Sequence, residues 1–72
     1  MTPKDVAKLY PNKAELGRLL KTTGACVSMW HVRGRVPPLN QIRLNVLSKG
    51  KLRPDRETLA YAKNCGLDGL LK

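Results

Sequence analysis

One glycine, Gly17, sits in a short helical segment, and apolar residues surround it at fixed distances. Leu16 and Leu20 lie one residue before it and three after it, and Val27 and Trp30 lie ten and thirteen residues beyond it. Where two helices cross steeply, the middle of the first needs a small residue, because the second backbone passes directly over it. This spacing predicts two short helices that cross at Gly17 and turn Val27 and Trp30 toward a shared core.

A tight turn is expected between these two helices. The run Thr22-Thr23-Gly24 interrupts the helical pattern, and Thr23 is a favourable N-cap for the second helix. By this spacing Lys21 occupies a turn position that is commonly Gly, because the position takes a positive φ that strains other residues. Either this turn differs in detail from the usual one, or Gly24 takes the tight geometry instead.

The rest of the chain also has helical signals and no alternating strand pattern. Helices are expected over about 3–10, 13–20, 24–33, 38–47 and 56–64. Thr2, Asn12, Thr23 and Asp55 are the expected N-caps, and Gly34 is expected to end the third helix in a left-handed C-cap. The chain is therefore predicted to be all-α, a small bundle of about five helices that contains a helix-turn-helix.

The expected core is aliphatic, since the chain has no Phe and a single Trp. Trp30 is its largest expected member. Cys26 is expected to be buried beside Val27. The other expected inward residues are Ala14, Leu16, Leu19 and Leu20, then Leu39, Ile42, Val46 and Leu47, and finally Leu59, Ala60 and Ala62.

The length of 72 residues allows one domain, expected over 1–66, followed by a short apolar tail over 67–72. No apolar run is long enough to cross a membrane. The first ten residues lack the apolar core of a signal peptide. We therefore expect a cytoplasmic protein.

The charge of the chain is large and one-sided. The formal net charge is +9, and no Asp or Glu occurs from Leu16 to Pro54. Lys and Arg near phosphates release condensed counterions, so such a window favours a polyanionic partner. Membrane binding usually needs a long helix with a basic face opposite bulky apolar residues, and here the basic residues are spread over several short elements. Nucleic acid is the favoured partner, and no membrane association is expected.

Enzymatic signals are weak. The five acidic residues are dispersed, no His, Cys and Ser cluster has catalytic spacing, and no Gly-rich phosphate loop is present. Cys26, Cys65 and the single His31 cannot complete a four-ligand zinc site. We expect no enzyme activity, no catalytic residue, no metal site and no cofactor.

Three blocks of the sequence resemble a known family. The blocks are Val27-Ser28-x-Trp30, Arg33-Gly34-Arg35-Val36-Pro37 and Lys51-Leu52-Arg53-Pro54-Asp55. They are similar to the Cro repressors of lambdoid phages and their prophage-encoded relatives, over about residues 3–55. Some members of that family are α+β and others all-α, and the helix-forming residues 56–64 favour the all-α form.

This resemblance implies a transcriptional repressor that binds a pseudo-palindromic operator in double-stranded DNA, with residues 24–33 as a recognition helix in the major groove. The groove-facing positions are small or apolar and offer few bidentate hydrogen bonds to bases. Arg33 and Arg35 would add base or phosphate contacts, and Thr23 with the helix amides would hold a phosphate. The implied DNA-binding residues are Asn12, Lys13, Thr23, Gly24, Ala25, Ser28, Met29, Val32, Arg33 and Arg35.

The resemblance also implies a weak homodimer in the bacterial cytoplasm, encoded by a phage or prophage. The dimer contact is expected in the fourth and fifth helices or in the C-terminal leucines. Two other functions remain open. One is an antitoxin or adaptor whose main partner is a protein docked on those C-terminal leucines, and the other is non-specific nucleic-acid binding, which leaves the helix-turn-helix spacing unexplained.

Overall fold

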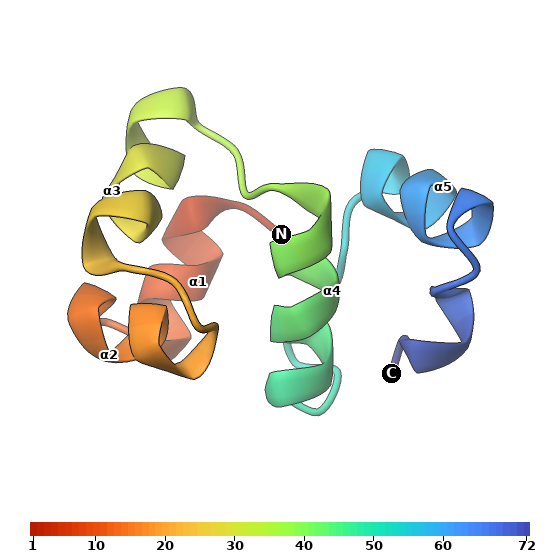
Figure 1. Ribbon diagram of the computed structural model, residues 1–72, viewed down its shortest axis with the longest axis horizontal. Helices are drawn as coiled ribbons and strands as arrows, with labels where there is room; N and C mark the ends of the chain where they lie inside the picture. Colours follow the sequence, from red (N-terminus) through yellow and green to blue (C-terminus); the bar gives the residue numbers. More distant parts are fainter. The chain divides into compact units, whose positions relative to one another are not determined.

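The computed structural model describes all residues from Met1 to Lys72 and contains only helices, turns and connecting segments. The chain forms five α-helices and one 3₁₀ turn, with no strand, and the helices are labelled in Figure 1. The predicted all-α fold with five helices is therefore confirmed. The elements are α1 (Pro3–Leu9), α2 (Lys13–Leu19), α3 (Gly24–Arg33), α4 (Pro38–Leu47), α5 (Arg56–Asn64) and the 3₁₀ turn η1 (Asp68–Leu70).

The chain divides into two compact units. The N-terminal unit, Thr2–Val36, contains α1, α2 and α3, and the C-terminal unit, Pro37–Lys72 together with Met1, contains α4, α5 and η1. Met1 belongs to the second unit because its amino group donates a hydrogen bond of 2.7 Å to the carbonyl oxygen of Arg53. The expected domain over 1–66 with its tail over 67–72 stays a prediction.

The four predicted N-caps are confirmed. The side-chain oxygens of Asn12, Thr23 and Asp55 accept hydrogen bonds from the backbone three residues on, at 3.0, 3.2 and 2.8 Å. Thr2 forms a reciprocal capping box with Asp5, at 3.3 and 3.0 Å. The hydrogen bonds from the backbone and then the hydroxyl of Thr2 lower the pKa of the Asp5 carboxyl. Each cap satisfies an amide that its helix cannot.

The core of the N-terminal unit is apolar. Val27 and Trp30 are buried on the inner face of α3, as predicted, with Trp30 only 4% exposed. Ala14 and Leu19 were expected to face inward, but both are exposed, Leu19 by 51%, so these two expectations were wrong. The buried apolar residues of this unit are Val6, Leu16, Leu20, Val27, Trp30 and Val36.

The core of the C-terminal unit corrects the predicted face of α4. Leu39, Val46 and Leu47 were expected to be buried, but each is at least 40% exposed. The buried residues of α4 instead combine two apolar side chains with two polar ones, and α5 contributes Thr58 and Ala62 rather than Leu59 and Ala60. The buried residues of α4 are Gln41, Ile42, Leu44 and Asn45.

Hydrogen bonds explain why polar residues occupy this core. Gln41 donates to the Asp55 carboxylate at 2.9 Å and accepts from the Asp55 amide at 3.0 Å. Asn45 donates to the Leu52 carbonyl at 2.9 Å and accepts from the Lys72 amide at 2.7 Å. Buried amide side chains are stable when both of their polar ends are paired in this way. Gln41 and Asn45 therefore hold the segments that precede and follow α5 against α4.

No helix in the chain is both long enough and apolar enough to cross a membrane.

Candidate nucleic-acid interface

The crossing of α2 and α3 depends on Gly17. A Cβ atom placed on Gly17 would lie 2.7 Å from the carbonyl carbon of Thr23 and 2.9 Å from the amide nitrogen of Gly24, closer than real Cβ atoms come. A side chain at this position would therefore push the start of α3 away from α2. The prediction of a small residue at the crossing is confirmed, and the neighbouring Leu16 is buried as expected.

The turn between α2 and α3 is a left-handed helix cap built on a lysine. Lys21 has a φ of 57°, and its amide bonds to the carbonyl of Arg18 at 3.1 Å. The amide of Thr22 bonds to the carbonyl of Gly17 at 2.7 Å, which completes a Schellman motif. Position 21 thus takes the usual left-handed conformation with Lys in place of Gly. Both expected alternatives were wrong, because the turn does not differ from the usual one and Gly24 is the first residue of α3.

The starts of α2 and α3 lie side by side. A Cβ atom placed on Gly24 would lie 3.3 Å from Cα of Ala14 and 3.6 Å from the carbonyl carbon of Lys13. Four predicted site residues, Asn12, Lys13, Thr23 and Gly24, are therefore brought together at one end of α3. The first amides of α3 have no helical acceptor, and the helix dipole adds a partial positive charge there. This end of α3 suits an anionic partner.

The outer face of α3 holds four more predicted residues. Ala25, Ser28, Met29 and Val32 follow the i, i+3, i+4, i+7 spacing of one helical face, and at about 100° per residue this face points away from the buried Val27 and Trp30. Ala25, Met29 and Val32 are exposed, and Ser28 is half-buried.

Two predicted arginines follow the outer face at the other end of α3. Arg33 is the last helical residue, and Gly34 caps the helix with a φ of 74°, as predicted. The chain then continues to Arg35, whose amide bonds to the carbonyl of Trp30 at 3.1 Å. Arg33 and Arg35 are both exposed. All ten predicted site residues thus belong to the N-terminal unit, and none of them is buried.

The position of Cys26 corrects another expectation. Cys26 was expected to be buried beside Val27, but its thiol is exposed in the first turn of α3. Hydrogen bonding from the hydroxyl of Thr22, and then from the hydroxyl and backbone of Thr23, lowers the pKa of the Cys26 thiol. Position 26 lies on the side of α3, between its buried and its outer face. The helical period alone did not distinguish this side position from the core.

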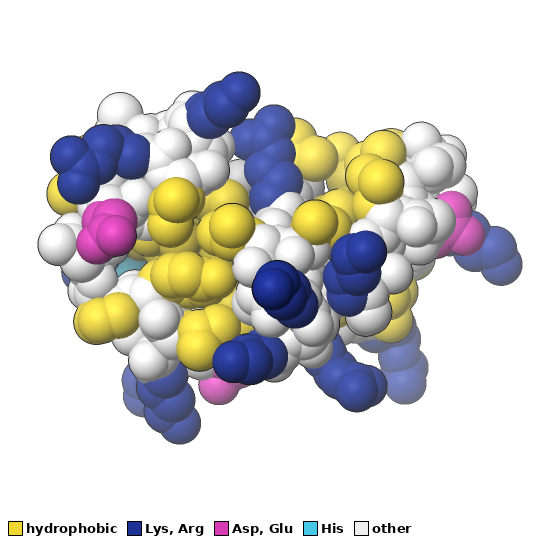
Figure 2. Space-filling view, turned by 90° about the horizontal axis from the view of Figure 1, so that it is seen from below, with side chains coloured by type: hydrophobic (Ala, Val, Ile, Leu, Met, Phe, Trp, Pro, Cys, Tyr) yellow, Lys and Arg dark blue, Asp and Glu magenta, His cyan; other side chains and the backbone are white.

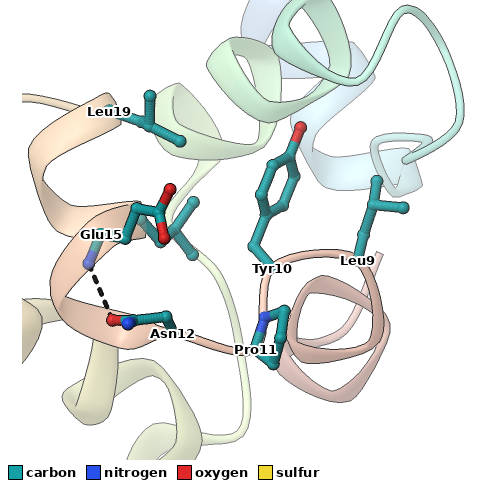
Figure 3. Close-up of a pocket in the computed structure, with 7 residues that line it drawn as sticks. Leu9, Tyr10, Pro11, Asn12, Glu15 and Leu19 are labelled. Atoms are coloured by element: carbon teal, nitrogen blue, oxygen red, sulfur yellow. Dashed lines mark hydrogen bonds between the residues drawn. The ribbon is translucent and has the colours of Figure 1, made fainter.

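A small pocket of about 170 Å³ lies where α1 meets α2. Figure 3 shows Leu9, Tyr10, Glu15 and Leu19 around it, with the Asn12 side chain bonded to the Glu15 amide. Its lining is mostly apolar and includes a single carboxylate. The pocket therefore has no feature that would attract phosphate, unlike the start of α3 beside it.

The charge of the N-terminal unit favours an anionic partner. The unit has seven basic and two acidic residues, a formal charge of +5. The space-filling view in Figure 2 shows many Lys and Arg side chains and few acidic ones. Lys21 is exposed, is absent from the predicted set and lies two residues before the N-cap of α3. The window without acidic residues contained Lys21, but the helix-turn-helix spacing favoured glycine at this turn position.

No known protein family, curated protein or solved structure matches this chain. No group of three or more His, Cys, Asp or Glu side chains is placed to hold a metal ion.

Proposed function

We propose that this chain is a sequence-specific, DNA-binding transcriptional repressor of the phage or prophage Cro type, acting in the bacterial cytoplasm. One observation carries the proposal. The face of α3 with Ala25, Ser28, Met29 and Val32 points outward, opposite the buried Val27 and Trp30, while α2 braces the same helix at Gly17. A helix held this way can enter the major groove of duplex DNA with its outer face toward the bases.

Phosphate contacts would hold this helix in its groove. At one end of α3, the backbone of Lys13 lies beside Gly24, and the Thr23 hydroxyl caps the helix. At the other end, Arg33 and Arg35 are exposed. Contacts of this kind set the orientation of a protein on DNA, and base contacts then supply sequence preference.

Repression would follow from a dimer that covers a promoter, with no cofactor. We propose a weak homodimer on a pseudo-palindromic operator whose half-sites are about 34 Å apart. Leu59 and Leu70 of the C-terminal unit support such a contact, since they are 47% and 54% exposed. Analytical ultracentrifugation should show monomer at nanomolar concentration without DNA and dimer on DNA, and a tight dimer without DNA would contradict this model of assembly.

The function is tested by selecting binding sites from random DNA duplexes at about 150 mM salt and sequencing those retained. An inverted repeat with a fixed half-site spacing is the expected result. Retention without sequence preference that disappears with added salt would overturn specific repression, because it would mean that the charge only holds the DNA backbone.

Two substitutions separate orientation from sequence reading. Arg35→Ala should weaken binding to all sequences and reduce the salt dependence, as expected for a phosphate contact. Ser28→Ala should change which sequence is preferred, because the difference in binding free energy between two bases at the contacted position should change by about 1 kcal/mol. Lys4→Ala is the control, because it removes one exposed charge from α1 in the same unit. Equal effects of Lys4→Ala and Arg35→Ala would contradict the proposed placement of DNA on α3.

A second function has one observation in its favour. The C-terminal unit exposes Leu59, Tyr61 and Leu70, which would suit an antitoxin or adaptor whose main partner is a protein. In that case Leu59→Ser with Leu70→Ser would abolish protein binding and leave the selected DNA site unchanged. If the same pair of substitutions weakens operator binding with a steeper dependence on protein concentration, the two leucines belong to the dimer instead.

A further inference from the structure

The outer face of α3 is unusual for a surface that reads bases. Among its four side chains only Ser28 can form hydrogen bonds, and Ser28 is half-buried. Val32 is 76% exposed, the largest value among the exposed large hydrophobic residues, and Met29 is 45% exposed. No long polar side chain projects from this face, so the bidentate pairs that Arg, Asn and Gln make with purines cannot form from it.

The chemistry of the major groove leaves one target for such a face. Base edges there present hydrogen-bond donors and acceptors, and the one apolar group among the four standard bases is the C5-methyl of thymine. Ala25, Met29 and Val32 present methyl, thioether and isopropyl groups, which gain free energy by covering a methyl group and excluding water from it.

We propose that α3 selects its DNA sites by covering thymine C5-methyl groups with Ala25, Met29 and Val32, so that the operator is read through methyl groups more than through base hydrogen bonds. This proposal rests on the function proposed above and names the feature of the DNA that is read. It predicts thymines at fixed positions in each half-site.

The charge around the face favours duplex DNA over an apolar protein surface as the occupant. Lys13 lies beside the start of α3, and Arg33 and Arg35 lie at its end, so the apolar face has cations beyond both of its ends. No acidic residue occurs from Leu16 to Pro54. An apolar strip with cations beyond its two ends matches a groove whose floor carries methyl groups and whose walls carry phosphates.

The test replaces single thymines by deoxyuridine in a DNA site obtained from the selection, which removes a methyl group and leaves every base-pair hydrogen bond. At each methyl that the protein covers, affinity should fall about fourfold, the factor for burying one methylene-sized group. Because the lost contact is apolar, this factor should be the same at low and high salt.

Two variants assign the effect to α3. In Val32→Ala the penalty for deoxyuridine should disappear at one thymine of each half-site and persist at the others. In Arg33→Ala affinity should fall for every duplex while all deoxyuridine penalties stay at about fourfold. Val32 is exposed, so its truncation should leave the helical circular-dichroism signal unchanged.

The outcomes separate this proposal from the proposed function. If the protein selects an inverted repeat and deoxyuridine has no effect at any position, methyl reading is wrong and operator binding stands. If deoxyuridine weakens binding equally in wild type and in the Val32→Ala and Met29→Ala variants, the methyl groups act through DNA shape and the proposal is also wrong. If no sequence is selected at all, both proposals fail together.

Discussion

The two units hold their helices together by different means. In the N-terminal unit, Trp30 and Val27 pack in an apolar core, and the crossing helix is positioned by the absence of a side chain at Gly17. In the C-terminal unit, the buried face of α4 carries Gln41 and Asn45, which bond to residues 14 and 27 positions away, respectively.

This difference bears on what each unit can tolerate. Apolar packing is non-directional and fails by leaving a cavity, whereas a buried amide fails by leaving its partners without hydrogen bonds. The unit proposed to bind DNA therefore depends on the shape of its core. The other unit also buries apolar side chains, such as Ile42 and Leu44, and depends in addition on a few directional bonds that fix two loop segments.

The largest expected effect is that of Trp30→Ala. Truncating a buried Trp costs about 3–5 kcal/mol, and a domain of this size has little more than that to lose. We expect the N-terminal unit to unfold, measured as loss of hydrogen-exchange protection over residues 2–36. Met29→Ala is the neighbouring control, since Met29 is half exposed. A folded Trp30→Ala variant that fails only to bind DNA would show that Trp30 is a contact residue and not part of the core.

Asn45→Ala should destabilise the C-terminal unit by about 2 kcal/mol, because it leaves the Leu52 carbonyl without its donor and the Lys72 amide without its acceptor. Urea denaturation should show a lower midpoint with an unchanged slope. Val46→Ala, at an exposed neighbouring position, should change stability by less than about 0.5 kcal/mol. Equal losses for the two variants would remove the proposed role of directional bonds.

Asp55→Asn should lower the free energy of unfolding by a smaller amount, and this amount should depend on pH. Burial raises the pKa of the Asp55 carboxyl, but hydrogen bonds from the Gln41 side chain and the Thr58 amide outweigh it and lower the pKa. A lowered pKa in the folded state stabilises the fold above the unfolded value of about 3.9, and the stabilisation is lost as pH falls below it.

The expected difference in the free energy of unfolding between wild type and Asp55→Asn is about 1 kcal/mol at pH 7. The new side chain has one acceptor oxygen in place of two, so it cannot accept from both the Gln41 side chain and the Thr58 amide. The difference should shrink as the pH is lowered through 4. Asp68→Asn, which removes the same charge from exposed η1, serves as the control. A difference that stays constant from pH 7 to pH 3 would show that ionisation of Asp55 plays no part.

The smallest expected effects come from a feature that the two units share. Lys21 and Lys49 both follow a helix end in the left-handed region, with φ of 57° and 56°. Lys21→Gly and Lys49→Gly should each stabilise the protein by less than about 1 kcal/mol, because relief of backbone strain exceeds the added chain entropy of glycine. Only Lys21→Gly should weaken DNA binding. Equal losses of DNA affinity would mean that both units contact DNA.

The sequence predicted the N-terminal unit better than the C-terminal unit. Thr23, Gly34 and the spacing from Gly17 to Trp30 are local signals, and they gave the bounds of α3 and the crossing of α2 correctly. On α4 the spacing of Leu39, Ile42 and Val46 predicted an apolar stripe, but the face that is buried is selected by bonds from Gln41 and Asn45 to distant backbone groups. Hydrophobic period carries no information about such partners.

The sequence predicted part of the candidate site. Helical period and the family pattern together identified an outer face of α3 that the structure leaves uncovered. They did not predict that Cys26 is exposed. Cys26 is next to the buried Val27 in the sequence, and the helical period does not tell which of two adjacent positions the neighbouring helices cover. Lys21 was left out of the predicted site, because its turn position requires a positive φ, and glycine adopts a positive φ without the strain that lysine bears.

The contact at Gly17 has a consequence for how this protein can vary. Every other amino acid carries a Cβ atom, and the atoms that would meet it belong to the backbone of Thr23 and Gly24, which no change of side chain can move aside. No second substitution of a neighbouring side chain can therefore restore a variant at position 17. In a saturation library this position should be invariant among folded clones, while the outward residues of α3 are free to diverge and, under the proposed function, would change which DNA is bound.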